Sequence, residues 1–200
     1  WDTPQTITVT GVDDDIIDGT ITSTITVAVD DANSDDNFDS VADETVSATT
    51  TDDDVAGFTI VESDGSTEVD ESGTTDTFTI VLDAQPTSDV VLTIASDDTG
   101  EATVPASVTF TSANWDTPQT ITVTGIDDGT LIDGNQDTNV IVSIDDANSD
   151  DGFDSLEDQT VVVTTTDDDT PEFTVTETDG STEVAESGTT DTFSVVLDAQ

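Results

Sequence analysis

The segment TFTIVLDAQPTSDVVLTIAS at 77–96 decides the fold class of this chain. Apolar and polar residues alternate in TFTIVLD (77–83) and in DVVLTIAS (89–96), where Val, Ile, Leu, Phe and Thr dominate. A period of two in that composition is typical of β-strands. The intervening AQPT (84–87) has the composition of a loop. The segment therefore predicts two strands joined by a short connection.

The same pattern recurs on both sides of this segment, and no stretch has the period of a helix. Residues 55–169 are expected to hold seven strands, the first of them split by a turn at Asp64-Gly65. The ranges are 57–62 with 67–71, 77–83, 89–96, 106–111, 119–125, 138–144 and 159–166. Seven short antiparallel strands predict an all-β fold, a seven-stranded immunoglobulin-like Greek-key sandwich. Its buried face is expected to draw on Phe58, Phe78, Val81, Ile94, Phe110, Ile121, Val123, Ile141 and Val162.

Long internal repeats set the domain organisation. WDTPQTITVTG at 1–11 recurs unchanged at 115–125, and DGSTEVDESGTTDTF at 64–78 recurs at 179–193 with one change. The offset of about 115 residues is the size of a whole domain. We therefore expect tandem sandwiches: the C-terminal part of a first repeat (1–54), one complete repeat (55–169) and the N-terminal part of a third (170–200). A chain that opens within a repeat is expected to be a mature or internal segment of a longer array.

The charge balance excludes several functions. The 200 residues include 48 Asp and Glu but no Lys, Arg, His or Cys, so the formal net charge is -48. Nucleic-acid binding needs basic groups to neutralise phosphates, and none exists here. Anionic membrane surfaces would repel the chain, and no apolar run approaches the roughly 18 residues that membrane insertion needs. The acidic residues gather between the strands, so a cation from outside the chain, most simply a divalent metal, must neutralise them.

The predicted topology brings three acidic segments to one end of the complete repeat. The connections after the third and fifth strands and the end of the last strand meet there, with Asp97, Asp98, Asp127, Asp128, Asp133, Asp167, Asp168 and Asp169. In the first repeat the matching set is Asp13, Asp14, Asp15, Asp18, Asp52, Asp53 and Asp54. Calcium, which takes about 6–8 oxygen ligands in flexible geometry, suits such a set, whereas zinc would want His or Cys. The alternative is that Asp is simply enriched in solvated turns.

VDESG (69–73), VTGIDD (123–128) and the terminal DDD (167–169) resemble the Calx-β domain. Tandem copies of that domain occur in large bacterial surface proteins and adhesins, and the resemblance covers the complete repeat and both partial ones. It implies a seven-stranded sandwich with calcium bound at one end. The ligands it implies are Glu62 on the first strand, Asp97 and Asp98, then Asp127, Asp128 and Asp133, and finally Asp167, Asp168 and Asp169. The connection SDDTGEATV (96–104), with Glu101, departs from the family's usual pattern.

A second, weaker calcium site is a candidate at the opposite end of the sandwich. Asp146, Asn148, Asp150, Asp154 and Glu157 stand at positions 1, 3, 5, 9 and 12 of a spacing that resembles a calcium-binding loop. The Gly expected at position 6 is missing, and the earlier copy lacks the Glu at position 12. A plain hairpin rich in Asp and Asn explains this stretch equally well.

These features predict a structural role. The chain is expected to be a calcium-rigidified stalk or fibre segment of an extracellular or cell-surface protein, with neighbouring repeats and other copies of the chain as partners. The alternative is a carbohydrate- or surface-binding adhesive module. An enzyme is not expected: carboxylate pairs can hydrolyse glycosides, but these acids lie in turns copied from repeat to repeat.

Overall fold

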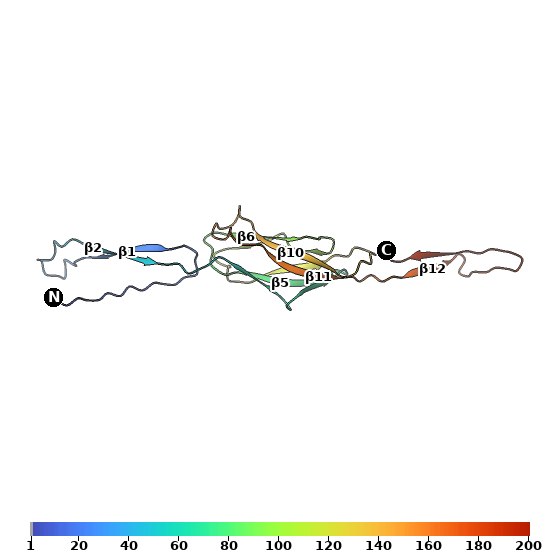
Figure 1. The fold of residues 1–200 in the computed structure, drawn as a ribbon, viewed down its shortest axis with the longest axis horizontal. Coiled ribbons are helices and arrows are strands. Elements are labelled where there is room, and N and C mark those ends of the chain that lie inside the picture. The colour runs from blue at the N-terminus through green and yellow to red at the C-terminus, as the bar shows by residue number, and fades with distance from the viewer. Residues whose placement is uncertain (1) are drawn as a thin grey trace.

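The computed structural model describes residues 2–200, which form three parts in a row along one axis (Figure 1). The central part is a β-sandwich. A two-stranded ribbon, β1 (Ile21–Val27) with β2 (Glu44–Thr50), lies on one side, and another, β12 (Phe173–Glu177) with β13 (Phe193–Leu197), lies on the other. The described residues include no helix long and apolar enough to cross a membrane.

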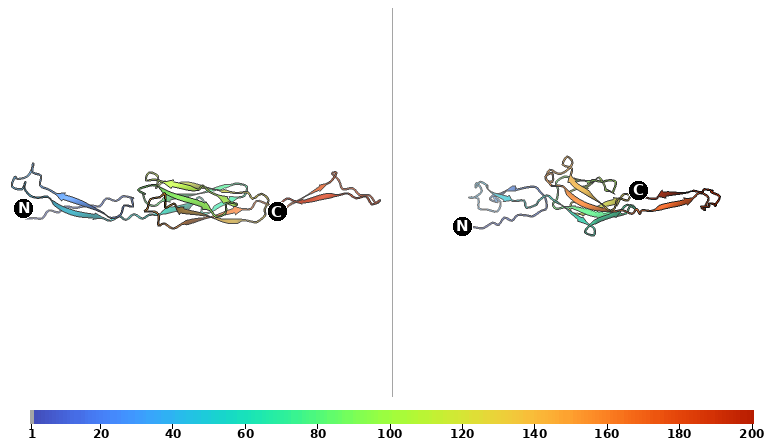
Figure 2. Two further views of the ribbon diagram at one scale, coloured as in Figure 1. Left: turned by 90° about the horizontal axis from the view of Figure 1, so that it is seen from above. Right: turned by 45° about the vertical axis from the view of Figure 1, so that its right-hand side comes forward.

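The central part is built from two sheets that face each other (Figure 2). One sheet has the order β4-β11-β10-β6-β8, and the other has the order β3-β5-β9-β7. All pairings are antiparallel except that of β4 with β11. The bounds are Phe58–Glu62 (β3), Thr67–Asp70 (β4), Thr75–Leu82 (β5), Val90–Ser96 (β6), Ala102–Thr103 (β7), Ser107–Phe110 (β8), Gln119–Gly125 (β9), Gln136–Ile144 (β10) and Gln159–Thr166 (β11).

The observed strands lie within one or two residues of the predicted ranges, and the first strand is split as expected. The short strand β7 is the addition. Its two residues pair with the end of β9, with Ala102 opposite Gly125. Composition gives no sign of this strand, because two residues are too few to show a period.

Apolar side chains from both sheets meet between them in one core, which includes Phe78, Ile80, Phe110 and Val123. The predicted buried face was wrong for Ile141 and Val162, which are 36% and 52% exposed. Their neighbours are buried instead: Val140, Val142, Val161 and Val163. Val81 is only partly buried, between Ile80 and Leu82 in the core. Runs such as VIV and VVV are apolar on both faces, so alternation cannot tell which face turns inward.

The flanking ribbons keep the registers of the complete sandwich. Ile21 pairs with Thr50 as Gln136 pairs with Thr165, both shifted by the repeat offset. Phe173 pairs with Leu197 as Phe58 pairs with Leu82. The flanking ribbons leave large apolar side chains exposed, such as Phe173 and Phe193, because only two strands are present to form each sheet.

Pairing also fixes which segments share an end of the sandwich. Ser96 at the end of β6 lies opposite Val140, and Gln136 at the start of β10 lies opposite Thr165 near the end of β11. The residues after β4, β6, β9 and β11 therefore lie at one end. The β10–β11 loop (residues 145–158) lies at the other end, next to the first ribbon.

Candidate metal centre

Glu71 is the most buried acidic residue of the sandwich, with 1% of its surface exposed. It directly follows β4, and its backbone N–H donates to the carbonyl of Thr166 at the end of β11 (3.2 Å). On its other side, the Asp70 carbonyl lies where a side chain at Gly125 would have to sit. Only glycine permits this approach of β4 to the end of β9. The VTG motif thus holds Glu71 beside the β9–β10 loop (residues 126–135).

Glu101 is brought to the same place by β7. It immediately precedes that strand, and its carbonyl accepts hydrogen bonds from the Ile126 N–H (2.8 Å) and the Thr165 hydroxyl (3.4 Å). Its side chain is 9% exposed. The sheet edge formed by β7 and β9 therefore carries a second carboxylate into the interior of this end.

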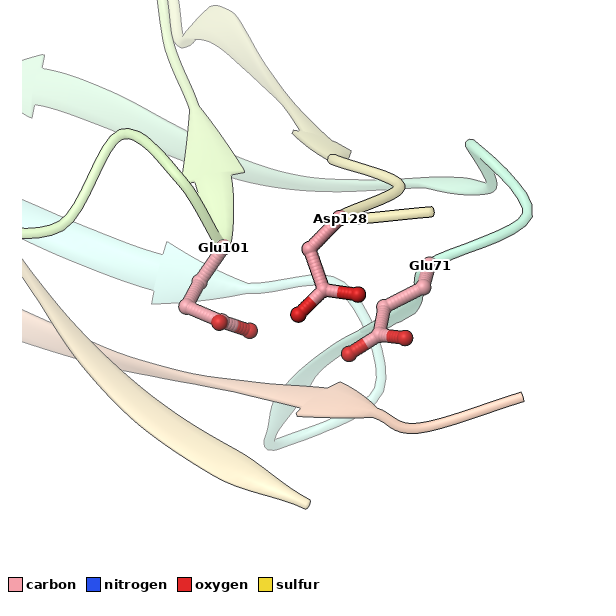
Figure 3. Close-up of side chains that lie close together, drawn as sticks. All are labelled: Glu71, Glu101 and Asp128. Atoms are coloured by element: carbon pink, nitrogen blue, oxygen red, sulfur yellow. The ribbon is translucent and has the colours of Figure 1, made fainter. Parts of the chain in front are cut away.

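Two overlapping groups of carboxylates meet at Glu71. The first consists of Glu71, Glu101 and Asp128, drawn in Figure 3, where the three side chains point toward one another from separate segments. The second consists of Glu71, Asp167 and Asp169. Within each group, one carboxylate oxygen from each residue lies within 4.8 Å of the others. We refer to these five residues as the carboxylate cluster.

The cluster is under electrostatic strain. Burial, with the charges of Asp128, Asp167 and Glu101 adding to its effect, raises the pKa of Glu71 to about 7, while the nearby backbone N–H of Asp168 opposes the rise. Neither carboxylate oxygen of Glu71 has a hydrogen-bond partner of good geometry, and one oxygen of Glu101 has none. Buried charged groups without partners are costly, so this arrangement favours a bound cation or proton.

The three residues of the terminal DDD run (167–169) differ in their contacts and exposure. The Asp167 carboxylate accepts hydrogen bonds from the backbone N–H groups of Gly134 (2.8 Å) and Asp169 (2.9 Å), which ties the end of β11 to the β9–β10 loop. Asp169 keeps one buried oxygen without a partner. Burial raises the pKa of Asp169, and the charges of Asp168, Asp167, Asp128 and Asp127 add to the rise. Asp168 itself is exposed.

Other predicted ligands surround the cluster or lie apart from it. Burial raises the pKa of Glu101, and the charges of Asp133 and Asp98 add to the rise, so both are neighbours of the cluster, as are Asp127 and Asp168. Asp97 belongs to neither group, and its carboxylate accepts two hydrogen bonds from Asn139, both at 2.8 Å, which lower its pKa. Glu62 also lies outside both groups and accepts a hydrogen bond from the Thr67 hydroxyl (2.8 Å).

The chemistry of the donors fits calcium. Every candidate ligand atom is a carboxylate oxygen, and the chain has no Lys, Arg or His to neutralise it. Hard divalent cations prefer oxygen, and calcium accepts many such ligands with loose geometry. The buried oxygens of Glu71, Glu101 and Asp169 that lack partners are the sites that such an ion would satisfy.

The first part repeats this arrangement where its sequence is present. Asp52 accepts hydrogen bonds from the N–H groups of Gly19 (2.6 Å) and Asp54 (2.9 Å), matching Asp167 with Gly134 and Asp169. Burial raises the pKa of Asp54, and the charges of Asp52, Asp15, Asp53 and Asp13 contribute, whereas Asp14 caps the N–H of Ile16 (3.0 Å). Residues 1–54 include no counterpart of Glu71 or Glu101.

The β10–β11 loop uses its acidic residues differently. One oxygen of Asp150 accepts hydrogen bonds from the Thr87 N–H and hydroxyl (both 2.7 Å) and from the Ser88 N–H (2.9 Å), and the other accepts from the Gly152 N–H (3.0 Å). Asn148 donates to Asp145 (2.9 Å). Asp146 and Glu157 are exposed, and neither group of clustered carboxylates includes a residue of this loop. Only Asp154 keeps a buried oxygen without a partner.

Sequence reasoning left Glu71 out of the ligand set, although it stands inside the quoted motif VDESG (69–73). The signal was available in the split first strand. If its first half lies in one sheet and its second half in the other, the residue after the second half must meet the end of β11. Glu101 was named with Asp97 and Asp98 as an acid of the connection that departs from the family's pattern, and β7, which brings it to the cluster, could not be foreseen.

Comparison with known proteins gives distant structural matches and no family. No family model matches the chain, and no curated protein matches it. The Escherichia coli chaperone DraB has a TM-score of 0.40 at 7% identity, with 60% of this chain and 59% of that one covered. Domains 4 and 5 of the S-layer protein SbsC have a TM-score of 0.39 at 19% identity, with 72% of this chain and 57% of that one covered. The Caenorhabditis elegans MSP-domain protein SSP-19 has a TM-score of 0.35 at 14% identity, with 54% of this chain and 97% of that one covered. At these scores, the likenesses carry no conclusion about function.

Proposed function

We propose that this chain is a segment of an extracellular or cell-surface stalk, made of tandem Calx-β-like sandwiches that calcium stiffens. The observation that carries the proposal is the carboxylate cluster around Glu71. Glu71 itself is 1% exposed, and its carboxylate has no hydrogen-bond partner of good geometry. A chain without basic side chains cannot neutralise this group internally. Calcium outside cells is abundant enough to fill weak sites, whereas cytosolic calcium is too scarce.

The position of the cluster supports a role in stiffness. Asp167 and Asp169 belong to the segment that leaves the sandwich toward β12, and Glu71, Glu101 and Asp128 belong to the body of the sandwich. An ion held by both sets would fix the first residues of the connection to the domain that precedes it. The same acidic run stands at residues 52–54, between the first part and the sandwich. Repeated along an array, such fixed connections would make a rod.

Calorimetric titration with calcium tests the site. We expect binding to the whole chain, with the affinity lowered at least about tenfold by Glu71→Gln, since a tenfold change corresponds to about 1.4 kcal/mol. Glu186→Gln is the matched control: it stands at the equivalent repeat position, but it is exposed and lies outside both carboxylate groups. Equal affinities of the two variants would overturn the assignment of the cluster.

Small-angle scattering tests the stiffening. In calcium the chain should give the profile of a narrow rod. In chelator the profile should broaden toward a bent ensemble, because like charges around residues 52–54 and 167–169 favour separation without fixing an angle. A profile that does not change with calcium would contradict the stalk mechanism even if calcium binds.

A further inference from the structure

The junction between the first part and the sandwich has a contact that the acidic clusters do not explain. Besides the covalent connection, the loop that precedes β1 touches the sandwich directly. The Gln85 N–H donates to the Asp15 carbonyl (2.7 Å), and Ile16 forms a parallel β-bridge with Gln85. Gln85 lies between β5 and β6, at the end of the sandwich that faces the first part.

An apolar contact accompanies this backbone bridge. Ile17 is partly buried and packs against the hydrophobic core of the sandwich. Its side chain also lies against Gly152 in the β10–β11 loop, where a methyl group in place of the glycine hydrogen would be 3.9 Å away. The β10–β11 loop is itself held down by Phe153, which is fully buried, and by the hydrogen bonds to Asp150. Ile17 therefore packs against a loop that a buried side chain and hydrogen bonds hold in place.

The same bridge forms again one repeat later. The Gln200 N–H donates to the Thr130 carbonyl (2.6 Å), and the Ile132 N–H donates to the Gln200 carbonyl (3.0 Å). Gln200 is the repeat counterpart of Gln85, and Leu131-Ile132 are the counterparts of Ile16-Ile17. A contact that recurs with equivalent residues belongs to the repeat and is not an accident of one junction.

The two junctions differ in one informative way. The part after the second junction includes β12 and β13 but no counterpart of the β10–β11 loop within residues 170–200. There Leu131 and Ile132 are 41% and 38% exposed, whereas Ile16 and Ile17 at the first junction are partly buried. The pair is therefore less exposed at the first junction, where Ile17 meets the loop that carries Gly152.

We propose that residues 12–19 form a clasp, with Ile16-Ile17 docking the first part on the sandwich and the following Asp18-Gly19 bound to the acidic run of the first part. The second attachment is visible in the Gly19 N–H, which donates to Asp52 (2.6 Å). One short loop therefore contacts both sides of the junction. Its partner is the next repeat of the same chain, at the surface formed by Gln85 and Gly152.

Two attachments constrain a junction more than one does. The connection through residues 51–57 alone would leave bending and twisting free, and the clasp, which meets the sandwich at a separate point, removes much of that freedom. Calcium would affect the clasp by binding near Asp52, which holds the loop through Gly19. This coupling between calcium and the clasp rests on the proposed function. Without the ion, repulsion among Asp13, Asp15, Asp52 and Asp54 would push the loop away from the acidic run and weaken the docking.

Spin-label distances across the junction test the clasp. The chain has no cysteine, so Thr45→Cys and Thr109→Cys provide unique labels on exposed strand positions of the first part and the sandwich. In the otherwise unchanged chain, calcium should narrow the distance distribution. Ile17→Ser should abolish that narrowing, and Ile17→Ala should weaken it. Ile132→Ser, with the same local chemistry at the other junction, should leave it intact.

The outcomes separate the clasp from the calcium mechanism. Equal distributions for Ile17→Ser and Ile132→Ser would overturn the clasp, whatever calcium does. A distribution that is narrow with and without calcium, and broad only in Ile17→Ser, would support the clasp and contradict calcium stiffening. Thermal unfolding of the central sandwich should be the same in the Ile17 and Ile132 variants. A selective loss of stability in Ile17→Ser would mean that the residue supports the domain instead of the junction.

Discussion

The two ends of the central sandwich are both rich in carboxylates, and the surroundings of Asp150 at one end and Glu71 at the other have opposite effects on them. At the β10–β11 end, burial raises the pKa of Asp150, but hydrogen bonds from Thr87, Gly152 and Ser88 outweigh this effect and lower it. At the other end, Glu71 has no donor that meets good geometry, and its pKa rises to about 7. The supply of hydrogen-bond donors, more than the number of acids, separates a structural carboxylate from a candidate ligand.

The largest expected effect of this difference is on stability in chelator. Removing calcium should lower the melting temperature of the sandwich strongly, because the carboxylate cluster then repels itself without a counter-ion. Differential scanning calorimetry at low ionic strength measures this, and added monovalent salt should restore part of the loss by screening. Melting that is unchanged after verified calcium removal would show that the cluster needs no ion.

The second effect concerns affinity and compares the two ends directly. Replacing Asp167, Asp168 and Asp169 with Asn should weaken calcium binding by at least about tenfold, or 1.4 kcal/mol, more than replacing Asp146, Asp150 and Asp154. The terminal run supplies Asp167 and Asp169 to the carboxylate cluster, to which four segments contribute. In the β10–β11 loop, by contrast, the Asp150 carboxylate already accepts hydrogen bonds. Calorimetric titration with the reverse order would move the main site to the other end.

Much of this arrangement follows from the sequence. The period of two predicted the strands to within one or two residues, because it depends on spacing alone. Convergence of the acidic segments at one end follows from antiparallel pairing, which residues 96 and 140 illustrate. Burial does not follow: VIV at 140–142 is apolar on both faces, so its inward face depends on the opposite sheet.

The choice among the acidic residues followed from the sequence only in part. Asp97 was a predicted ligand, and in the structure its carboxylate accepts hydrogen bonds from Asn139, 42 residues away. Glu71 was passed over until the approach of β4 to Gly125 showed how deeply it lies. The clasp could not be foreseen either, since Ile16-Ile17 reads as a short apolar pair in an acidic loop. In each case the decisive partner lies far away in the chain.

A third, smaller effect should appear at the β10–β11 end and should not depend on calcium. Asp150→Ala removes the acceptor of four hydrogen bonds and leaves the Thr87 and Ser88 N–H groups without it, which should cost roughly 1–3 kcal/mol of unfolding free energy. Asp146→Ala, an exposed acid in the same loop, is the control and should change little. Chemical denaturation in calcium and in chelator measures both. A loss that appears only in calcium would make Asp150 a ligand.

The last effect is the pH dependence of the calcium-free sandwich. The pKa of Glu71 is raised from 4.5 to about 7 by burial and by Asp128, Asp167 and Glu101, so the folded state holds a proton that the unfolded chain has released. Stability contributed by that proton is fully present below pH 4.5 and is lost as the pH rises to about 7, at no more than about 1.4 kcal/mol per pH unit. Glu101 and Asp169, whose pKa values are also raised, act in the same direction.

Calcium should reverse this trend, because the ion replaces the proton and binds the charged carboxylates more tightly as the pH rises. Melting temperatures measured from pH 5 to pH 7.5 should therefore fall in chelator and rise or stay level in calcium. Glu71→Gln should flatten the fall in chelator, and Glu186→Gln should leave it unchanged. If stability in chelator rose over this range, the protons would be held by the unfolded chain. The carboxylate cluster would then resemble Asp150 in the β10–β11 loop, whose carboxylate accepts hydrogen bonds and needs no cation.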